Sequence, residues 1–232
     1  MRAKAFLFGV FLILFSARFA WAGTLTGKAL FSGTAPAPQK IDMGADPTCS
    51  SLHPEPVYSE EVVKNEDGTL RNVFVYVKQG LEGKTFPAPQ TPAVLDQNRC
   101  HYAPHVSGVQ VGQKLQIVNS DSTLHNVHGI PTQSKEFNLG MPIQGMKLDR
   151  TFDKPEVMVK FKCDVHPWMR AYVGVLEHPF FSVTGTDGAF EIKDLLPGKY
   201  TIEAWHEKFG VQAQEVTVEE ATPAKVDFTF VG

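Results

Sequence analysis

Residues 162–169 read Lys-Cys-Asp-Val-His-Pro-Trp-Met (KCDVHPWM) and place a thiol, an imidazole and a thioether at successive intervals of three residues. The sequence on both sides alternates between apolar and other residues, with EVMVKFK at 156–162 and AYVGVLE at 171–177. Alternation with a period of two is the pattern of a β-strand with one buried face. The stretch therefore predicts two strands joined by a short loop that carries Cys163, His166 and Met169.

The same short alternating pattern recurs along the chain. Further examples are LTGKALF (25–31), NVFVYVK (72–78), KLQIVNS (114–120), GAFEIK (188–193), KYTIEAW (199–205) and KVDFTF (225–230). Glycine, aspartate and proline separate these segments, and no amphipathic helical pattern longer than two turns interrupts them. Evenly spaced short strands with such turns predict an all-β fold built as one β-sandwich or a pair of them.

The first 22 residues have the composition of a secretory signal peptide. Arg2 and Lys4 precede the apolar run AFLFGVFLILF, and Ala20-Trp21-Ala22 matches an A-x-A cleavage site. The run is shorter than a membrane-spanning helix requires, so we expect a mature chain from Gly23 in the periplasm or outside the cell, without an integral membrane span. Because this leader carries three basic residues and no acid, the net charge of −3 becomes about −6 without it. The absence of a basic stripe disfavours nucleic acid as a partner.

Three cysteines in an oxidising compartment cannot all pair within one chain. The most economical arrangement is a Cys49–Cys100 disulfide, because only Cys163 has other soft ligands beside it. A different pairing and an intermolecular bridge remain alternatives.

The segment 162–169 needs one more imidazole to complete a metal site, and His125 follows the candidate strand KLQIVNS and a polar turn. Two histidines, a thiolate and a weak axial thioether form the mononuclear blue-copper (type 1) site. A zinc site is the alternative, but the chain offers no second pair of the C-x-x-C or C-x-x-H type to close a tetrahedron.

The pattern Leu124-His125-Asn126-Val127-His128, followed by Cys163-x-x-His166-x-x-Met169, resembles the cupredoxins, and the short ligand loop resembles amicyanin in particular. The segment 111–119 (VGQKLQIVN) also fits a strand of that family. The resemblance implies one copper ion held by His125, Cys163, His166 and Met169, with Asn126 tying the two ligand segments together. One departure is Val165, which stands where amicyanin-like loops usually carry proline.

The segments outside the copper-binding part resemble a second β-domain. Residues 183–205 contain T-x-x-D-G-x-F and L-x-P-G-x-Y-x-I patterns similar to the carboxypeptidase regulatory-like (transthyretin-like) domain. We therefore expect a cupredoxin-like domain at 91–180, and an outer β-domain at 181–232 completed by residues 23–90, which include the Cys49 loop. The alternative is an N-terminal extension of the cupredoxin followed by a separate small domain.

The function expected from these features is one-electron transport, with no enzymatic activity. Pro167 and Trp168 follow His166, so we expect the imidazole edge to emerge through an apolar docking patch that receives a redox partner, by family analogy a cytochrome c or a dehydrogenase. Non-redox copper storage, delivery or sensing is an alternative, as is a surface- or carbohydrate-binding module. An enzyme would require a second metal site built by His105, His178 or His206, and His128 is a further candidate ligand for such a site.

Overall fold

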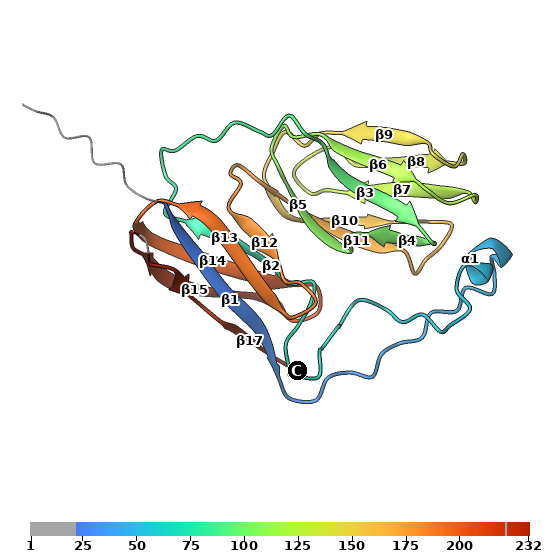
Figure 1. Ribbon diagram of the computed structural model, residues 1–232. Coiled ribbons are helices and arrows are strands. Elements are labelled where there is room, and N and C mark those ends of the chain that lie inside the picture. Colours follow the sequence, from blue (N-terminus) through green and yellow to red (C-terminus); the bar gives the residue numbers. More distant parts are fainter. Residues whose placement is uncertain (1–21, 221) are drawn as a thin grey trace, which may run out of the picture.

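The computed structural model describes residues 22–220 and 222–232 and confirms an all-β fold, which consists of two β-sandwiches (Figure 1). The predicted leader, except for Ala22, lies outside the described residues. Within the part of the chain that the structure describes, no helix is long and apolar enough to cross a membrane.

The first sandwich, called here the inner sandwich, is built from the middle of the chain. One sheet has the order β5-β11-β10-β7-β8 and the other the order β4-β3-β6-β9. The strands are β3 (Ala93–Asn98), β4 (His101–Ala103), β5 (Val106–Gln110), β6 (Leu115–Asn119), β7 (His125–Ile130), β8 (Phe137–Met141), β9 (Lys147–Arg150), β10 (Glu156–Lys162) and β11 (Arg170–Leu176). β10 and β11 are antiparallel neighbours, whereas β5 pairs with β11 and β3 with β6 in parallel. Alternate residues such as Leu115 and Ile117 are fully buried, as the period-two pattern predicts.

The second sandwich, called here the outer sandwich, combines strands from both ends of the chain. β1 pairs with β13, β16 and β17, and the facing sheet has the order β12-β2-β14-β15. The strands are β1 (Gly23–Ser32), β2 (Phe74–Gln79), β12 (Phe181–Val183), β13 (Ala189–Leu195), β14 (Gly198–His206), β15 (Gly210–Val218), β16 (Ala224–Lys225) and β17 (Phe228–Val231). Its core therefore joins residues such as Leu25 and Val75 to Ile202 and Phe230 in one hydrophobic cluster.

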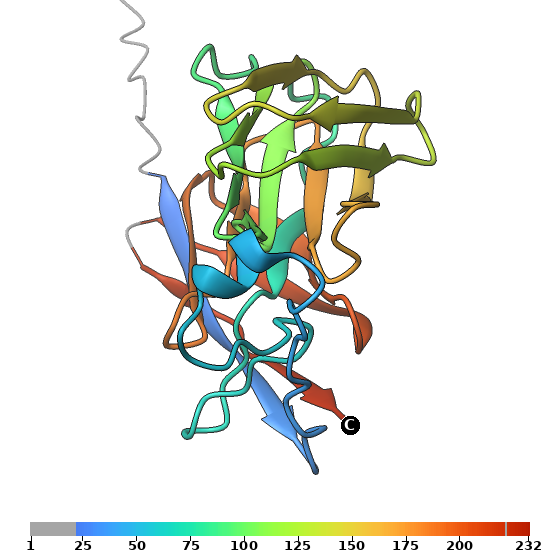
Figure 2. The ribbon, with the colours of Figure 1, turned by 90° about the vertical axis from the view of Figure 1, so that its right-hand side faces the viewer.

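A long arm, residues 33–73, connects β1 to β2 and carries the short helix α1 (Pro47–Ser51) to the end of the inner sandwich (Figures 1 and 2). Asp46 caps this helix by accepting hydrogen bonds from the N–H groups of Thr48 and Cys49, and Pro47 occupies the first turn. Met43 and Cys49 of the arm are buried in the hydrophobic cluster of the inner sandwich. The Cys49 segment, expected to be an irregular loop, is thus a capped helical turn.

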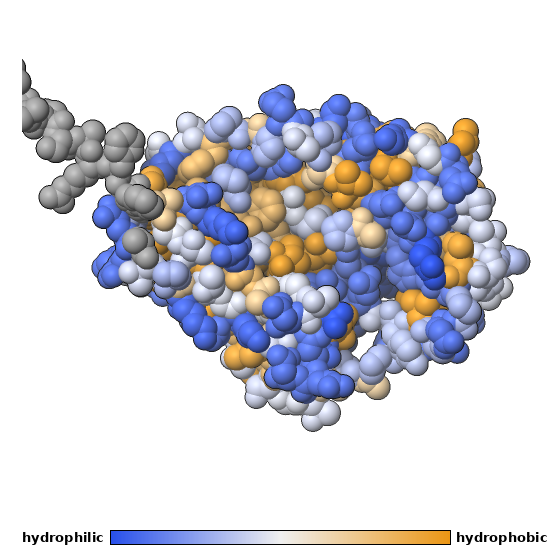
Figure 3. All heavy atoms as spheres, viewed as in Figure 1, coloured by the Kyte–Doolittle hydropathy of each residue, from blue (hydrophilic) through white to orange (hydrophobic). Residues whose placement is uncertain are grey.

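The two sandwiches pack tightly where small residues meet aromatic rings. A Cβ added to Gly174 of β11 would lie 2.4 Å from the ring of Phe74 on β2, and one added to Gly108 of β5 would lie 2.4 Å from Phe181 on β12. On the side of the molecule that Figure 3 shows, hydrophilic residues cover much of the surface, and hydrophobic residues gather near its middle. Glycine at these two positions allows the aromatic side chains of the outer sandwich to approach the backbone of the inner one.

Candidate metal centre

Cys163, His166 and Met169 lie on the loop between β10 and β11, and two hydrogen bonds close this loop. The Cys163 N–H donates to the carbonyl of Met169 at 3.2 Å, and the Met169 N–H donates to the carbonyl of His166 at 2.9 Å. The short loop therefore folds over itself at the end of two paired strands, and its three soft side chains stay together.

His125 is the first residue of β7, which pairs with β10, and so it reaches the same end of the sandwich. Its Nδ1 atom lies 2.9 Å from Nδ1 of His166, and Sγ of Cys163 lies 3.8 Å from the same His166 atom. One ligand atom from each of these three residues falls within 4.8 Å of the others. His125 and Cys163 are 38 positions apart in the sequence, and the fold brings them together in space.

The three side chains and Met169 are buried. The exposed fractions are 0% for His125 and Met169, 1% for Cys163 and 2% for His166. Hydrogen bonding to the imidazole of His125 and to backbone N–H groups outweighs burial and lowers the pKa of the Cys163 thiol. One of these donors is the His166 N–H, 3.4 Å from Sγ. The surroundings thus favour the thiolate, the form in which cysteine binds metals.

Asn126 connects the two ligand segments, as the cupredoxin resemblance implies. Its side-chain oxygen accepts a hydrogen bond from the Asp164 N–H at 2.5 Å, and its Nδ2 group donates to the Asn138 side chain at 2.5 Å. The Asp164 bond holds the residue after His125 against the residue after Cys163, and the Asn138 bond ties Asn126 to β8.

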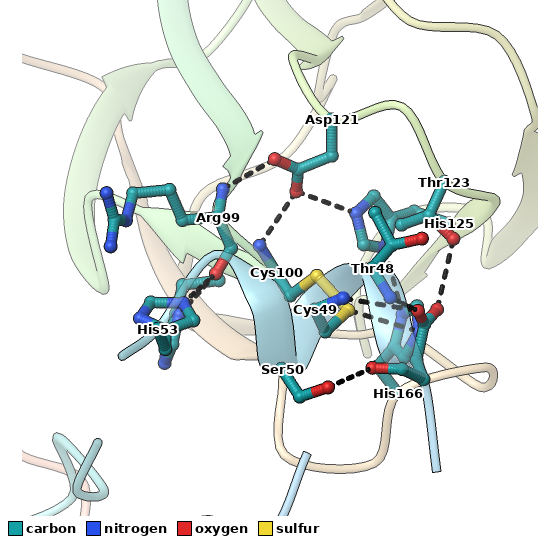
Figure 4. Close-up of a disulfide and its surroundings, with 12 residues drawn as sticks. Thr48, Cys49, Ser50, His53, Arg99, Cys100, Asp121, Thr123, His125 and His166 are labelled. Carbon is teal, nitrogen blue, oxygen red and sulfur yellow. Dashed lines mark hydrogen bonds and ion pairs between the residues drawn. A yellow bond between two sulfur atoms is a disulfide. The ribbon is translucent and has the colours of Figure 1, made fainter. Parts of the chain in front are cut away.

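Two carboxylates that no sequence motif indicated hold the outer nitrogens of the histidines. Nε2 of His125 lies 2.9 Å from Oδ2 of Asp121 (Figure 4), and Nε2 of His166 lies 3.0 Å from Oδ2 of Asp46. Nδ1 is therefore the ring nitrogen of each histidine that is turned toward the other ligands, and it can donate its lone pair to a metal ion once it carries no hydrogen. Carboxylates in this position fix the orientation of metal-binding histidines and increase their basicity.

The carboxylates are themselves held in place by backbone N–H groups. Asp121 accepts hydrogen bonds from the N–H groups of Arg99 and Cys100 at 2.6 and 2.7 Å. Asp46 accepts from the helix α1 backbone and from the Thr123 hydroxyl. Burial would raise the pKa of Asp46, but the hydrogen bond with His166 and those with Cys49, Thr123 and Thr48 lower it to about 2. Burial would also raise the pKa of Asp121, but its hydrogen bonds, above all the one with His125, lower it.

The predicted Cys49–Cys100 disulfide is confirmed, with sulfurs 2.00 Å apart and Cα atoms 5.7 Å apart, and Cys163 is the free cysteine. Sγ of Cys49 lies 3.6 Å from Nε2 of His166, so the disulfide holds helix α1 against this imidazole (Figure 4). The bridge thus links the arm to the end of the inner sandwich.

The expectation that the His166 edge emerges at the surface is wrong, because helix α1 covers it and leaves 2% of the residue exposed. Pro167 is exposed, whereas Trp168 is half-buried and donates its indole N–H to the carbonyl of Cys100 at 3.0 Å. Its ring centroid lies 5.0 Å from that of His166. Trp168, and not the imidazole, is therefore the aromatic group at the surface of the site.

The four other candidate histidines take part in different contacts. His105 lies 2.5 Å from Glu207, His128 contacts Glu136 and Asp164, His178 stacks on Phe180, and His206 stacks on Phe209. Among residues 22–220 and 222–232, the groups with metal-compatible geometry are the one described above and two that combine His125 or His166 with its carboxylate and a disulfide cysteine. None of the four histidines belongs to them.

Comparisons with known proteins give partial similarities. The family model described as "BOS complex subunit NOMO1-like, second beta sandwich domain" matches residues 180–228, which confirms the expected second β-domain as a β-sandwich. No curated protein is similar enough in sequence to count as a match.

Several solved structures are similar to parts of the chain. A copper-containing nitrite reductase from Thermus scotoductus is 24% identical over 41% of this chain and 24% of its own, with a TM-score of 0.35. A purple cupredoxin from Nitrosopumilus maritimus is 24% identical over 36% of this chain and 98% of its own, with a TM-score of 0.31. A Cu(I) form of an amicyanin mutant is 22% identical over 44% of this chain and 97% of its own, with a TM-score of 0.33. The chain thus spans about a quarter of the nitrite reductase and nearly all of the two small proteins.

Proposed function

We propose that the protein is a type 1 copper protein that carries single electrons outside the cytoplasm. The observation that carries this proposal is the convergence of His125 Nδ1, His166 Nδ1 and Cys163 Sγ on one buried point, with Met169 buried on the same loop. A copper ion bound there would supply a one-electron couple between Cu(I) and Cu(II), and this donor set fits both states.

The enclosure of the site supports a carrier. Asp46 and Asp121 orient the two imidazoles, and the loop hydrogen bonds fix Cys163 and Met169. Ligands held by packing and by outer hydrogen bonds resist rearrangement, which keeps the cost of changing oxidation state low. All four candidate ligands are at most 2% exposed, which leaves little access for a substrate to a bound ion.

The extracytoplasmic location is supported by the leader-like first 22 residues and by the Cys49–Cys100 disulfide. The partner proposed for the carrier is a redox protein such as a cytochrome c or a dehydrogenase, and its docking patch is Pro167 with Trp168. The cupredoxin resemblance supports this class of partner, and the position of Trp168 against His166 supports this patch.

Voltammetry of the copper-loaded protein, expressed without residues 1–22, tests the proposal. We expect one copper per chain, an intense blue charge-transfer band and a reversible one-electron wave, with the band lost in Cys163→Ser. A colourless protein that binds only Cu(I) would contradict electron transport and support storage or delivery. A preference for zinc over copper would contradict the copper assignment.

A further inference from the structure

A cavity of about 370 Å³ opens between the arm, the inner sandwich and the turn after β14. The arm contributes residues 39–42 and 59–61, the inner sandwich contributes Trp168 and Arg170, and the outer sandwich contributes Glu207. Binding sites for small molecules have volumes of roughly 300–1,000 Å³ and combine apolar walls with a few converging polar groups. The cavity has the size of such a site, and its walls come from three separate parts of the chain.

The cavity is connected to the candidate metal centre through one side chain. Trp168 lines the cavity and its ring lies 5.0 Å from the His166 ring, measured between centroids. Because His166 itself is 2% exposed, a molecule in the cavity would contact Trp168 and not the imidazole.

The walls have a definite chemical character. Ile41, Pro167 and Trp168 give apolar and aromatic surface, while Glu60 and Arg170 supply a hydrogen-bond acceptor and donor.

The charges around the cavity nearly cancel. Glu207 pairs with His105 at 2.5 Å, with both side chains at most 7% exposed, and Glu61 pairs with Lys208 at 3.1 Å. Burial would lower the pKa of His105, but the hydrogen bond and the charge of Glu207 raise it, which favours the ionised form of this pair. The other charged side chains of the lining are Asp42, Glu60, Lys40 and Arg170, two of each sign. A cavity with balanced charge favours a neutral ligand over an anion or a cation.

We propose that this cavity binds a neutral aromatic compound that carries hydroxyl groups, of the phenol or hydroquinone class. Its ring packs between Pro167, Ile41 and Trp168, and its hydroxyl groups bond to Glu60 and Arg170. The binding site stands independently of copper, whereas its use as the entry point for a small electron donor rests on the proposed function.

Titration of the metal-free chain without residues 1–22 with resorcinol, a dihydroxybenzene, followed by calorimetry and Trp fluorescence, tests the inference. We expect saturable binding with one site per chain and weaker binding of benzoate, the matched anion. The double variant Glu60→Gln with Arg170→Gln lowers affinity at least tenfold, because it replaces two charged hydrogen bonds by weaker neutral ones, and a factor of ten corresponds to about 1.4 kcal/mol.

The matched control is Glu82→Gln with Lys84→Gln, which removes one charge of each sign from an exposed loop away from the cavity. The control binds resorcinol like the unaltered protein. Should the double variant not fold, Pro167→Asp, which places a charge on the apolar wall, takes its place with the same expected loss. Absence of saturable binding, equal binding by the variant and the control, or tighter binding of benzoate would overturn the inference. If the protein binds resorcinol but its copper-loaded form is not blue, the cavity inference stands and only the proposed function is contradicted.

Discussion

Replacement of Asp46 by asparagine separates the two roles that this residue has in the structure. Asparagine caps a helix about as well as aspartate, so helix α1 keeps its N-terminal hydrogen bonds with Thr48 and Cys49. The carboxylate that lies 3.0 Å from Nε2 of His166 is lost. Asp46→Asn therefore weakens the hold on His166 without removing the helix cap, whereas Asp46→Ala removes both.

The expected size of the effect follows from the position of the carboxylate behind a metal-binding histidine. Loss of such a partner costs about 10- to 100-fold in metal affinity. A negative charge stabilises Cu(II) more than Cu(I), so we expect most of the loss in the oxidised form. A tenfold loss confined to one state of a one-electron couple corresponds to about 59 mV. The reduction potential of Asp46→Asn should therefore rise by about 60–120 mV.

Protein-film voltammetry measures this potential, and competition with a copper chelator measures the affinity. Asp42→Asn is the matched control, because Asp42 lies on the same arm, is exposed, and accepts a hydrogen bond from the Gly44 N–H. An unchanged potential in Asp46→Asn, or the same shift in both variants, would refute the role assigned to Asp46. A fall in potential would refute the sign of the electrostatic argument.

Three further predictions concern stability and are measured by chemical denaturation of the metal-free protein. The pKa of Asp46 is lowered to about 2 and that of Asp121 is also lowered, so their contribution to stability is present above the ordinary carboxyl pKa of 3.8 and is lost as the pH falls toward 2. The denaturant concentration at the unfolding midpoint should therefore fall between pH 5 and pH 2, and a midpoint that rises on acidification would contradict this. The double variant Cys49→Ser with Cys100→Ser opens a loop with a sequence separation of 51, which should lower the free energy of unfolding by about 4 kcal/mol, and a loss below about 1 kcal/mol would contradict this estimate. Gly174→Ala should lower the free energy of unfolding by about 1–3 kcal/mol, because its Cβ would lie 2.4 Å from Phe74. Gly140→Ala is the control, because its Cβ would have nothing within 4 Å, and it should lower this free energy by less than about 1 kcal/mol. Equal effects would show that the contact between the sandwiches is not tight.

The candidate site was predictable to the extent that its residues carry local patterns. Cys163, His166 and Met169 share one loop between alternating strands, and His125 begins a strand after a polar turn. The disulfide followed from the chemistry of the three cysteines, since only Cys163 had soft ligands nearby. These features depend on residue type and short spacing, which sequence reasoning can use.

The packing of helix α1 over His166 could not be predicted in the same way. The contact between Asp46 and His166 spans 120 residues, and it depends on the path of an arm with little regular structure. Asp46-Pro47-Thr48 does carry a helix-start signal, which would have predicted α1 as a capped turn. Nothing in that signal indicates that the cap lies against an imidazole, because the contact arises from tertiary packing of Met43 and Cys49 on the inner sandwich.

The most direct test of the central claim is the X-ray absorption spectrum of the copper-loaded protein at the copper edge, recorded for the unaltered chain and for Cys163→Ser. The account predicts a first shell with one short thiolate sulfur and two imidazole nitrogens, and loss of the short sulfur in the variant. A shell of nitrogen and oxygen alone in the unaltered chain, or a short sulfur distance that persists in Cys163→Ser, would contradict the assignment of His125, Cys163 and His166 as the metal centre.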